Sequence, residues 1–271
     1  TAKRAKESIA ALSGKRCALL AAKDEVLTYR RALSKDALFA RLNALYEWQT
    51  GAEVLVSDIE AVLQLVPARL PVVTLAAGGE TDLSALLRSL VSLGYSREYN
   101  VEAKGSFALR GDILDIWPVN LEHPVRIDFF GDEVEAIKPY DEVTAERYPV
   151  LDRVDICSAT DAFYEEGEKE RVLAAMKKEA RRAKSSQAAG RMADIISAIE
   201  TEEQASDFTL PLLSSAVPFF SVLDGETLVI FDECKLISDK LDGLWKEHME
   251  RCAQLLEGGE AMNFSLRQYV A

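Results

Sequence analysis

The sequence lacks the features that mark membrane, secreted and metal-binding proteins. Its four cysteines are widely separated and form no C-x-x-C pair, which excludes a disulfide framework in a chain of 271 residues. Only two histidines, His123 and His248, are present, so a histidine-rich metal site is excluded. No run of ~18 apolar residues could span a bilayer, and no signal-peptide core follows the cationic start. We therefore expect a cytoplasmic protein without a membrane segment.

Proline and glycine are scarce, and acidic residues outnumber basic ones. With 8 prolines, 14 glycines and 48% hydrophobic residues the chain is neither collagen-like nor disordered, and its length predicts two folding units. The net charge, 32 minus 45 or −13, opposes binding to a phosphate backbone by any broad surface and favours a protein partner. Residues 1–50 nevertheless hold ten Lys/Arg against five Asp/Glu, so nucleic-acid binding stays open as a third class of function.

A phosphate-binding loop is also missing. Such a loop needs a glycine-rich turn followed by a lysine and a hydroxyl residue. Residues 13–16 supply one glycine and one lysine, but Ile9 stands where the first glycine belongs and Arg16 replaces the hydroxyl. We interpret this stretch as a turn that enters a strand. Without the loop, Asp232 and Glu233 have no triphosphate to act on, and we interpret Asp232 as a strand-end turn or a helix cap.

The other candidates for catalysis or nucleic-acid binding are interpreted as solvated side chains. A Ser-His-Asp triad would have to use His123 or His248, and both are expected to be solvated. Acidic pairs and a basic stripe in polar runs are explained more simply as solvated faces or helix starts than as sites. These are Glu165/Glu166, Glu202/Glu203 and Lys177 to Lys184.

The hydrophobic pattern divides the chain into three segments, 1–71, 72–157 and 158–271. The first alternates helices with buried strands, a βαβα pattern that predicts a parallel sheet covered by helices. Helices are expected at 5–12, 38–46 and 59–65, the last capped by Asp58, and strands at 16–21 and 53–57.

The second segment has the pattern of an antiparallel α+β module. A helix at 82–94 precedes short alternating strands, and the glycines of Gly111-Asp112 and Gly131-Asp132 supply the positive φ that two-residue hairpin turns require. The strands are expected at 106–110, 113–117, 125–130, 133–138 and 153–157.

The third segment returns to the α/β pattern. A long alanine-rich helix near 168–200 starts with acidic residues and ends with basic ones, as the helix dipole favours. A fully apolar strand is expected at 227–231 and another helix at 240–256. The simplest topology is an α/β fold in which the second segment is inserted into one layer made by the other two.

One strand presents a face that a merely solvated surface does not need. In residues 125–130 the period of two puts Phe129 on the core face, and Arg126 and Phe130 on the other. In the first strand of the module, small residues lead to an accessible Arg110. Arginine and aromatic side chains are enriched at binding hot spots. Periodicity alone leaves a second explanation equally open, in which Phe130 packs under a loop and both arginines form weak surface ion pairs.

The module resembles one that two bacterial repair proteins share, the transcription-repair coupling factor and the excinuclease component UvrB. The ordered matches are Gly94-Tyr95, Val101-Glu102, 105–118, 122–135 and Tyr140-Asp141. Weaker likeness to the coupling factor's N-terminal region covers 24–29, 41–42, 54–57 and 228–233, and with it nearly the whole chain. The resemblance implies a degenerate helicase-type (P-loop-like) parallel sheet layer with an inserted antiparallel α+β adaptor module.

The two relatives can be separated. UvrB has a functional phosphate loop and a tyrosine-rich hairpin that inserts into DNA, whereas residues 22–40 here hold only Tyr29 and leave no room for that hairpin. The chain is therefore identified with the N-terminal region of coupling factors, which lacks both elements. Two departures from the pattern are the stretch 142–146 and Trp117, where phenylalanine is common.

The resemblance also implies a role. In both relatives the module binds the excinuclease component UvrA, and the contact positions fall on Arg110, Arg126 and Phe130. It implies a non-catalytic docking region that acts in transcription-coupled nucleotide excision repair. Such a region would need no cofactor and would not bind DNA strongly. We expect it to be monomeric and to contact other domains of a longer coupling factor. The alternative is an N-terminal fragment of UvrB or of a related ATP-dependent DNA helicase.

The missing phosphate loop leads to a prediction about nucleotides. We expect the chain neither to bind nor to hydrolyse ATP, because Asp232 and Glu233 alone cannot hold a triphosphate. Isothermal titration with magnesium-ATP should show no heat of binding. A dissociation constant of ~1 μM, equivalent to ~8 kcal/mol of binding free energy, would contradict this expectation.

Overall fold

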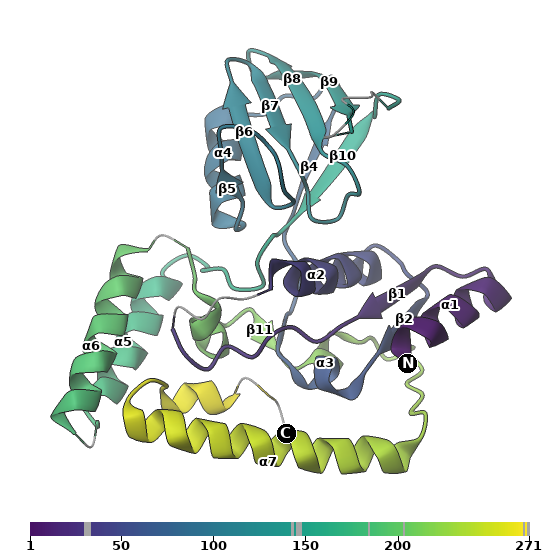
Figure 1. Ribbon diagram of the computed structural model, residues 1–271. Coiled ribbons are helices and arrows are strands. Elements are labelled where there is room, and N and C mark those ends of the chain that lie inside the picture. The colour runs from purple at the N-terminus through teal and green to yellow at the C-terminus, as the bar shows by residue number, and fades with distance from the viewer. Residues whose placement is uncertain are drawn as a thin grey trace. The chain divides into compact units, whose positions relative to one another are not determined.

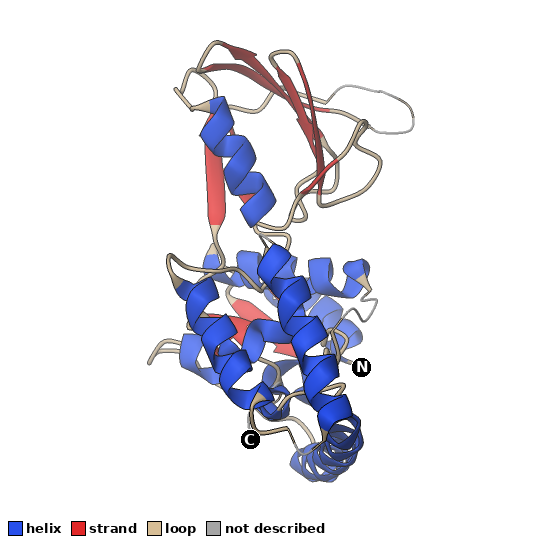
Figure 2. Ribbon diagram, turned by 90° about the vertical axis from the view of Figure 1, so that its left-hand side faces the viewer, coloured by secondary structure: helices blue, strands red, loops and turns tan. Residues whose placement is uncertain are grey.

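The computed structural model describes residues 1–29, 34–141, 144, 148–183, 185–202, 204–267 and 269 (Figure 1). The chain divides into two compact units. The first unit comprises Thr1–Arg41, Gly51–Arg69 and Asp161–Ala271, and the second comprises Leu42–Thr50 and Leu70–Thr160. Helices dominate the first unit and strands the second (Figure 2). Among the described residues, no helix combines the length and the apolar character that crossing a membrane demands.

The start of the first unit follows the predicted alternation of helices and strands. Strands β1 and β2 run parallel with Cys17 opposite Val54, and α1 packs against both. Helix α1 ends at Gly14, whose φ of 68° lets the chain turn into β1, so the turn predicted at 13–16 is confirmed. Asp58 caps α3 as predicted, because its carboxylate accepts from the amide of Ala61. The elements are α1 (Ala2–Ser13), β1 (Cys17–Leu20), α2 (Lys35–Gln49), β2 (Val54–Ser57), α3 (Ile59–Leu63) and β3 (Val66–Pro67).

The single long helix expected near 168–200 is wrong, because two helices occupy that stretch. Helix α5 (Glu168–Ala180) and helix α6 (Ser186–Thr201) pack side by side (Figure 1). The hydroxyl of Ser185 accepts from the amide of Ala188 and so begins a new helix. The helix pair buries an apolar core made of Val172, Met176, Met192, Ile196, Ile199, Phe208 and Phe264. The predicted basic stripe ends at Lys184, which lies outside the described residues.

The strand expected at 227–231 is also wrong. These residues form no ladder, and Leu228 and Ile230 are 80% and 79% exposed. A strand needs a partner edge for its amides and carbonyls, which an apolar sequence by itself does not specify. The predicted helix that follows is confirmed but begins earlier, as α7 (Cys234–Gly258). Its N-cap is Glu233, at a φ of 57°, so Asp232 is neither a strand end nor the cap.

The remaining elements of the first unit are short. Strand β11 (Ala216–Val217) pairs antiparallel with β3, and the 3₁₀-helices η1 (Asp207–Leu212), η2 (Phe219–Val222) and η3 (Asn263–Arg267) lie on either side of α7 in the sequence.

The second unit is built on a five-stranded sheet of order β5-β6-β7-β8-β9, in which the strands predicted at 106–110, 113–117, 125–130 and 133–138 are neighbours. Strands β6 to β9 are antiparallel, and β5 joins β6 in parallel. Gly111 and Gly131 occupy the two hairpin turns with φ values of 61° and 62°, as the sequence predicts. The strands are β5 (Ser96–Arg97), β6 (Ser106–Arg110), β7 (Ile113–Ile116), β8 (Val125–Phe130) and β9 (Glu133–Pro139).

A second pair of strands completes this unit. Strand β10 (Arg153–Cys157), which the sequence predicts, pairs antiparallel with β4 (Val72–Ala76), which the prediction missed. The signal for β4 was its run of β-branched and apolar residues after a proline. Helix α4 (Leu83–Ser92) is capped by Asp82 and buries Leu86 and Leu90.

The opposite faces of β8 differ sharply in burial, which gives a test of the face assignment. The Phe129 side chain is 5% exposed, whereas that of Phe130 is 80% exposed. Phe129→Ala should therefore lower the free energy of unfolding by ~3 to 5 kcal/mol, because it removes a buried ring. Phe130→Ala should change it by less than ~0.5 kcal/mol. Urea unfolding of the two variants, followed by circular dichroism, checks this; the reverse order would invert the faces.

Candidate partner-binding site

The three residues proposed from the sequence lie on the outer face of the five-stranded sheet, opposite the core face. Arg110 is on β6, and Arg126 and Phe130 are on β8. Two rows of cross-strand neighbours extend across this face. The first row is Arg110, Ile113 and Asp128, and the second is Ala108, Asp115, Arg126 and Lys138. We call the solvent-accessible part of this surface, formed by Tyr99, Arg110, Ile113, Arg126, Asp128, Phe130 and Lys138, the docking face.

Arg126 is held by a carboxylate from the neighbouring strand. Its Nε donates to Oδ1 of Asp115 at 2.7 Å and its Nη2 donates to Oδ2 at 2.9 Å, a bidentate pair. The carboxylate is buried, whereas the Arg126 side chain is 39% exposed. The hydrogen bonds to Asp115 raise the pKa of Arg126 above its ordinary value. The ring of Tyr140 lies 5.6 Å from the guanidinium carbon. Arg126 is therefore fixed in place and already paired.

Arg110 has a different environment. Its Nη2 donates to the Asn100 side-chain oxygen at 2.7 Å and to the Tyr99 carbonyl at 3.3 Å. The guanidinium carbon lies 5.8 Å from the centre of the Tyr99 ring, which is itself 86% exposed. No carboxylate of the described residues forms an ion pair with Arg110. This arginine is exposed and keeps an uncompensated charge.

Phe130 completes the face at the end of β8. An 80% exposed ring does not fit the alternative in which Phe130 packs beneath a loop. Beside it, Lys138 and Asp128 form an ion pair across β8 and β9. Of the stretch 142–146, where the sequence departs from the family pattern, only Thr144 is described. The arrangement offers an apolar ring and guanidinium donors to another surface, which suits binding rather than catalysis.

Sequence reasoning missed two members of this arrangement, Asp115 and Tyr99. Asp115 lies directly opposite Arg126, but the pairing of β7 with β8 places it there, and neither predicted hairpin turn fixes that register. Tyr99 lies outside the regular strands, and no sequence period marks its side chain as exposed.

The prediction that both histidines are solvated is wrong for His248. His248 is buried on α7, where Nδ1 contacts the Glu25 carboxylate and Nε2 lies 3.6 Å from the Cys252 sulfur. Cys252, His248 and Glu25 are thus connected as in a Cys-His-Glu catalytic triad. Cys252 is fully buried, however, and burial raises the pKa of its thiol to about 11. A protonated thiol without access is not a nucleophile. His123 is half-buried and stacks on Tyr148, with ring centres 4.6 Å apart.

The acidic pairs have the exposure that the sequence predicts. Glu165 and Glu166 are exposed. Glu202 is exposed as well and accepts a hydrogen bond from the Tyr29 hydroxyl, while Glu203 lies outside the described residues.

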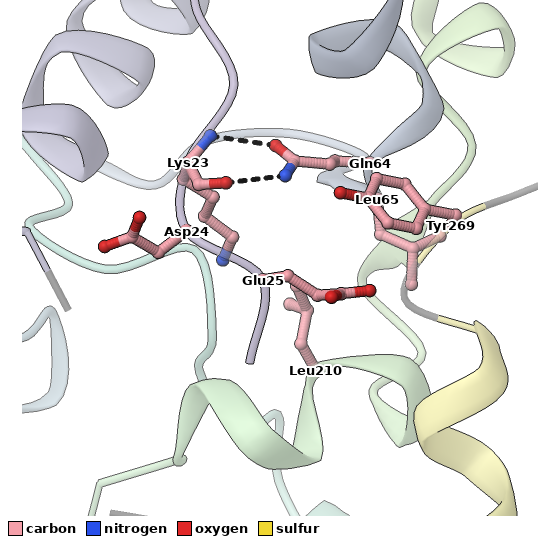
Figure 3. A pocket seen from close by; sticks show the side chains of 7 residues that line it. All are labelled: Lys23, Asp24, Glu25, Gln64, Leu65, Leu210 and Tyr269. Atoms are coloured by element: carbon pink, nitrogen blue, oxygen red, sulfur yellow. Dashed lines mark hydrogen bonds between the residues drawn. The ribbon is translucent and has the colours of Figure 1, made fainter. Parts of the chain in front are cut away.

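A small pocket in the first unit is the second candidate site, and several of its polar groups already bond to other residues of the fold (Figure 3). The Lys23 amide and carbonyl bond to the Gln64 side chain at 3.0 and 2.7 Å. The Lys23 ammonium points to Asp161, 2.7 Å away, and to Asp207. Burial alone would raise the pKa of Asp161, but the charge of Lys23 holds it below its ordinary value. The lining residues are Lys23, Asp24, Glu25, Gln64, Leu65, Leu210 and Tyr269.

These contacts assign the pocket to the fold rather than to a ligand. The described residues contain no group of three or more His, Cys, Asp or Glu side chains that could hold a metal ion. The docking face is therefore the better candidate for function.

Comparisons with known proteins support this choice. Residues 73–161 match the family model of the UvrB interaction domain. The whole chain is 26% identical over 292 aligned residues to the transcription-repair-coupling factor of Bacillus subtilis, and covers 25% of that protein. About half of it (52%) is 35% identical to the coupling factor of Myxococcus xanthus, and covers 12% of that protein. A smaller share, 40% of the chain, is 36% identical to UvrABC system protein B of Synechococcus elongatus, and covers 16% of it.

The resemblance expected from the sequence is thus confirmed. The chain is similar to the N-terminal UvrB-homology region of bacterial transcription-repair coupling factors, and its second unit carries the matched interaction domain. The chain spans between 12% and 25% of the length of these three relatives.

The buried pair in the first unit gives a prediction with a defined pH dependence. Lys23→Met should lower the free energy of unfolding at pH 7 by ~3 to 5 kcal/mol, because it removes the ammonium that is ion-paired with the buried Asp161 and leaves only the more distant charge of Arg41. In the variant, burial raises the folded-state pKa of Asp161. A buried carboxyl with a raised pKa is tolerated at low pH, where it is protonated and neutral, and it destabilises the fold as pH rises and it becomes charged. The stability difference from the parent should therefore shrink as pH falls.

Urea unfolding of the parent and the variant at several pH values measures that difference. The control is Lys15→Met, which removes an exposed lysine whose side chain is 52% accessible and should cost less than ~1 kcal/mol. A constant difference across the pH range would show that Asp161 is not the group that responds.

Proposed function

We propose that this chain is a non-catalytic docking region that recruits the excinuclease component UvrA in transcription-coupled nucleotide excision repair. The observation that carries the proposal is the docking face itself, because Arg110, Arg126 and Phe130 lie together on its accessible surface, on strands that belong to the matched interaction domain. The coupling-factor relatives point to transcription-coupled repair, and the UvrABC relative points to the excinuclease.

The face has the chemistry of a binding hot spot. An exposed aromatic ring gains most when it fills a pocket on a partner, and arginine contributes several donors from one side chain. The strands that present them are held by hairpins and have a buried core behind them, so little side-chain order must be created on binding. Phe130 supplies the apolar part of the contact, and the two arginines supply polar donors on the same face.

The proposal includes the absence of catalysis. The phosphate loop is replaced by a helix end at Gly14, and the acidic pair Asp232 and Glu233 precedes a helix without a strand behind it. The domain division that accompanies this role is 1–71 and 158–271 for a degenerate helicase-like layer and 72–157 for the UvrA-binding module. A monomer that binds duplex DNA only weakly completes the proposal, since the net charge of −13 repels the phosphate backbone.

The alternative, an N-terminal fragment of UvrB, is not favoured. The match to the Bacillus subtilis coupling factor covers 100% of the chain, whereas the UvrABC system protein B match covers 40% of it.

Alanine substitution tests the docking face directly. Arg110→Ala, Arg126→Ala and Phe130→Ala should each weaken binding of purified UvrA by ~2 kcal/mol or more, which is about thirtyfold in the dissociation constant. Calorimetric titration of the full chain measures this. Thermal melting should show folding nearly unchanged for Arg110→Ala and Phe130→Ala, whereas Arg126→Ala leaves the buried Asp115 carboxylate unpaired and should lower the melting temperature.

The matched control is Arg88→Ala, which removes an exposed arginine of the same unit from α4 instead of the sheet. Its binding should equal that of the parent. If all three face variants bound as tightly as the parent, the contact with UvrA would lie elsewhere on the chain.

A further inference from the structure

The two arginines of the docking face differ in how their charge is balanced. Arg126 donates two hydrogen bonds to the Asp115 carboxylate, at 2.7 and 2.9 Å, so its charge is neutralised within the sheet. Arg110 bonds only to uncharged oxygens, the Asn100 amide oxygen at 2.7 Å and the Tyr99 carbonyl at 3.3 Å. Both arginines carry the same formal charge, but only one presents it uncompensated to solvent.

We propose that the two arginines act differently on the partner, and that Asp115 and Tyr99 set this difference. Arg110, held in place by Tyr99 and Asn100, supplies the charge that attracts and meets a carboxylate of the partner. Arg126, fixed by Asp115, is a positioned hydrogen-bond donor that faces an uncharged acceptor such as a backbone carbonyl. Asp115 is thus a positioning residue for recognition. This inference rests on the proposed docking function and deepens it.

The number of free donors on Arg126 supports this role. A guanidinium has five N–H groups, and the pair with Asp115 uses one on Nε and one on Nη2. The remaining three keep a fixed direction because the Asp115 carboxylate is buried and comes from the adjacent strand β7. A partner carboxylate there would also meet the negative charge of Asp115, whereas a neutral acceptor would not.

Long-range attraction should depend on Arg110. An exposed charge at the rim of an interface mainly changes the association rate and its salt dependence, while a paired and partly buried group mainly changes the dissociation rate. Exposed charges are screened beyond ~8 Å at physiological ionic strength. The attraction that each arginine exerts on a partner therefore depends on the charged groups close to it.

The experiment compares two substitutions that each remove one negative charge from the same sheet face. Asp115→Asn removes the carboxylate that fixes Arg126, and Asp128→Asn removes the carboxylate paired with Lys138. Binding of the full chain to immobilised UvrA is followed by surface plasmon resonance at several salt concentrations. If charge alone mattered, both variants would bind an acidic partner more tightly.

The proposal expects opposite signs. Asp115→Asn should dissociate about tenfold faster, in spite of the lost negative charge, because Arg126 loses its fixed direction. Asp128→Asn should bind as tightly as the parent or more tightly. Arg110→Gln should associate more slowly and lose most of the salt dependence. The double variant Asp115→Asn/Arg126→Gln replaces both charges of the pair with neutral side chains. It should keep the salt dependence of the parent and dissociate faster than the parent.

The outcomes separate this inference from the function on which it rests. If the parent does not bind UvrA, the docking function fails and the inference with it. If the parent binds and both Asn variants tighten binding, or Arg110→Gln keeps the full salt dependence, the division of roles is overturned and the docking function stands.

Thermal melting of every variant provides the folding reference. Asp115→Glu provides a second variant, in which the negative charge is kept and the carboxylate is displaced. It should also dissociate faster than the parent.

Discussion

The register of the antiparallel sheet in the second unit is the constraint on which its surface depends. The hairpin turns at Gly111 and Gly131 fix β6 against β7 and β8 against β9, and the pairing of β7 with β8 sets Asp115 opposite Arg126. Because successive side chains alternate between faces, a shift of one residue would exchange Phe129 and Phe130. A β-bulge interrupts the pairing at Asp128 and Phe129, yet Phe130 still faces outward opposite Glu133.

Sequence patterns predicted this sheet well because its contacts are local. Each hairpin joins strands that are neighbours in the chain, with glycine at the position that needs a positive φ. The period of two then assigns Arg126 and Phe130 to one face without any knowledge of the rest of the fold. The cap of α3 was similarly predictable, since the carboxylate of Asp58 accepts from the amide three positions later.

The first unit was harder to predict because its contacts connect distant residues. Burial of His248 depends on Glu25, which is 223 positions away in the chain, and no period in the sequence relates the two. The apolar run 227–231 illustrates the opposite error, in which a strong local signal had no partner strand in the described residues. The charge balance on the docking face has the same origin, since it needs the side-chain partner of each arginine as well as its face.

The second unit interrupts the first, and this affects the order in which the chain folds. Lys23 and Asp161 are 138 positions apart and yet form a buried pair within the first unit. The second unit supplies most of the chain between them, and if it were unfolded its chain entropy would oppose their meeting. Val72 and Cys157, at the two ends of the insertion, are cross-strand partners, so a folded insertion brings its ends together beforehand. Synthesis adds ~5 to 20 residues per second, and the sheet is complete in the chain before α5, α6 and α7 are made. A second unit that folds first therefore shortens the loop that must close before Lys23 can pair with Asp161.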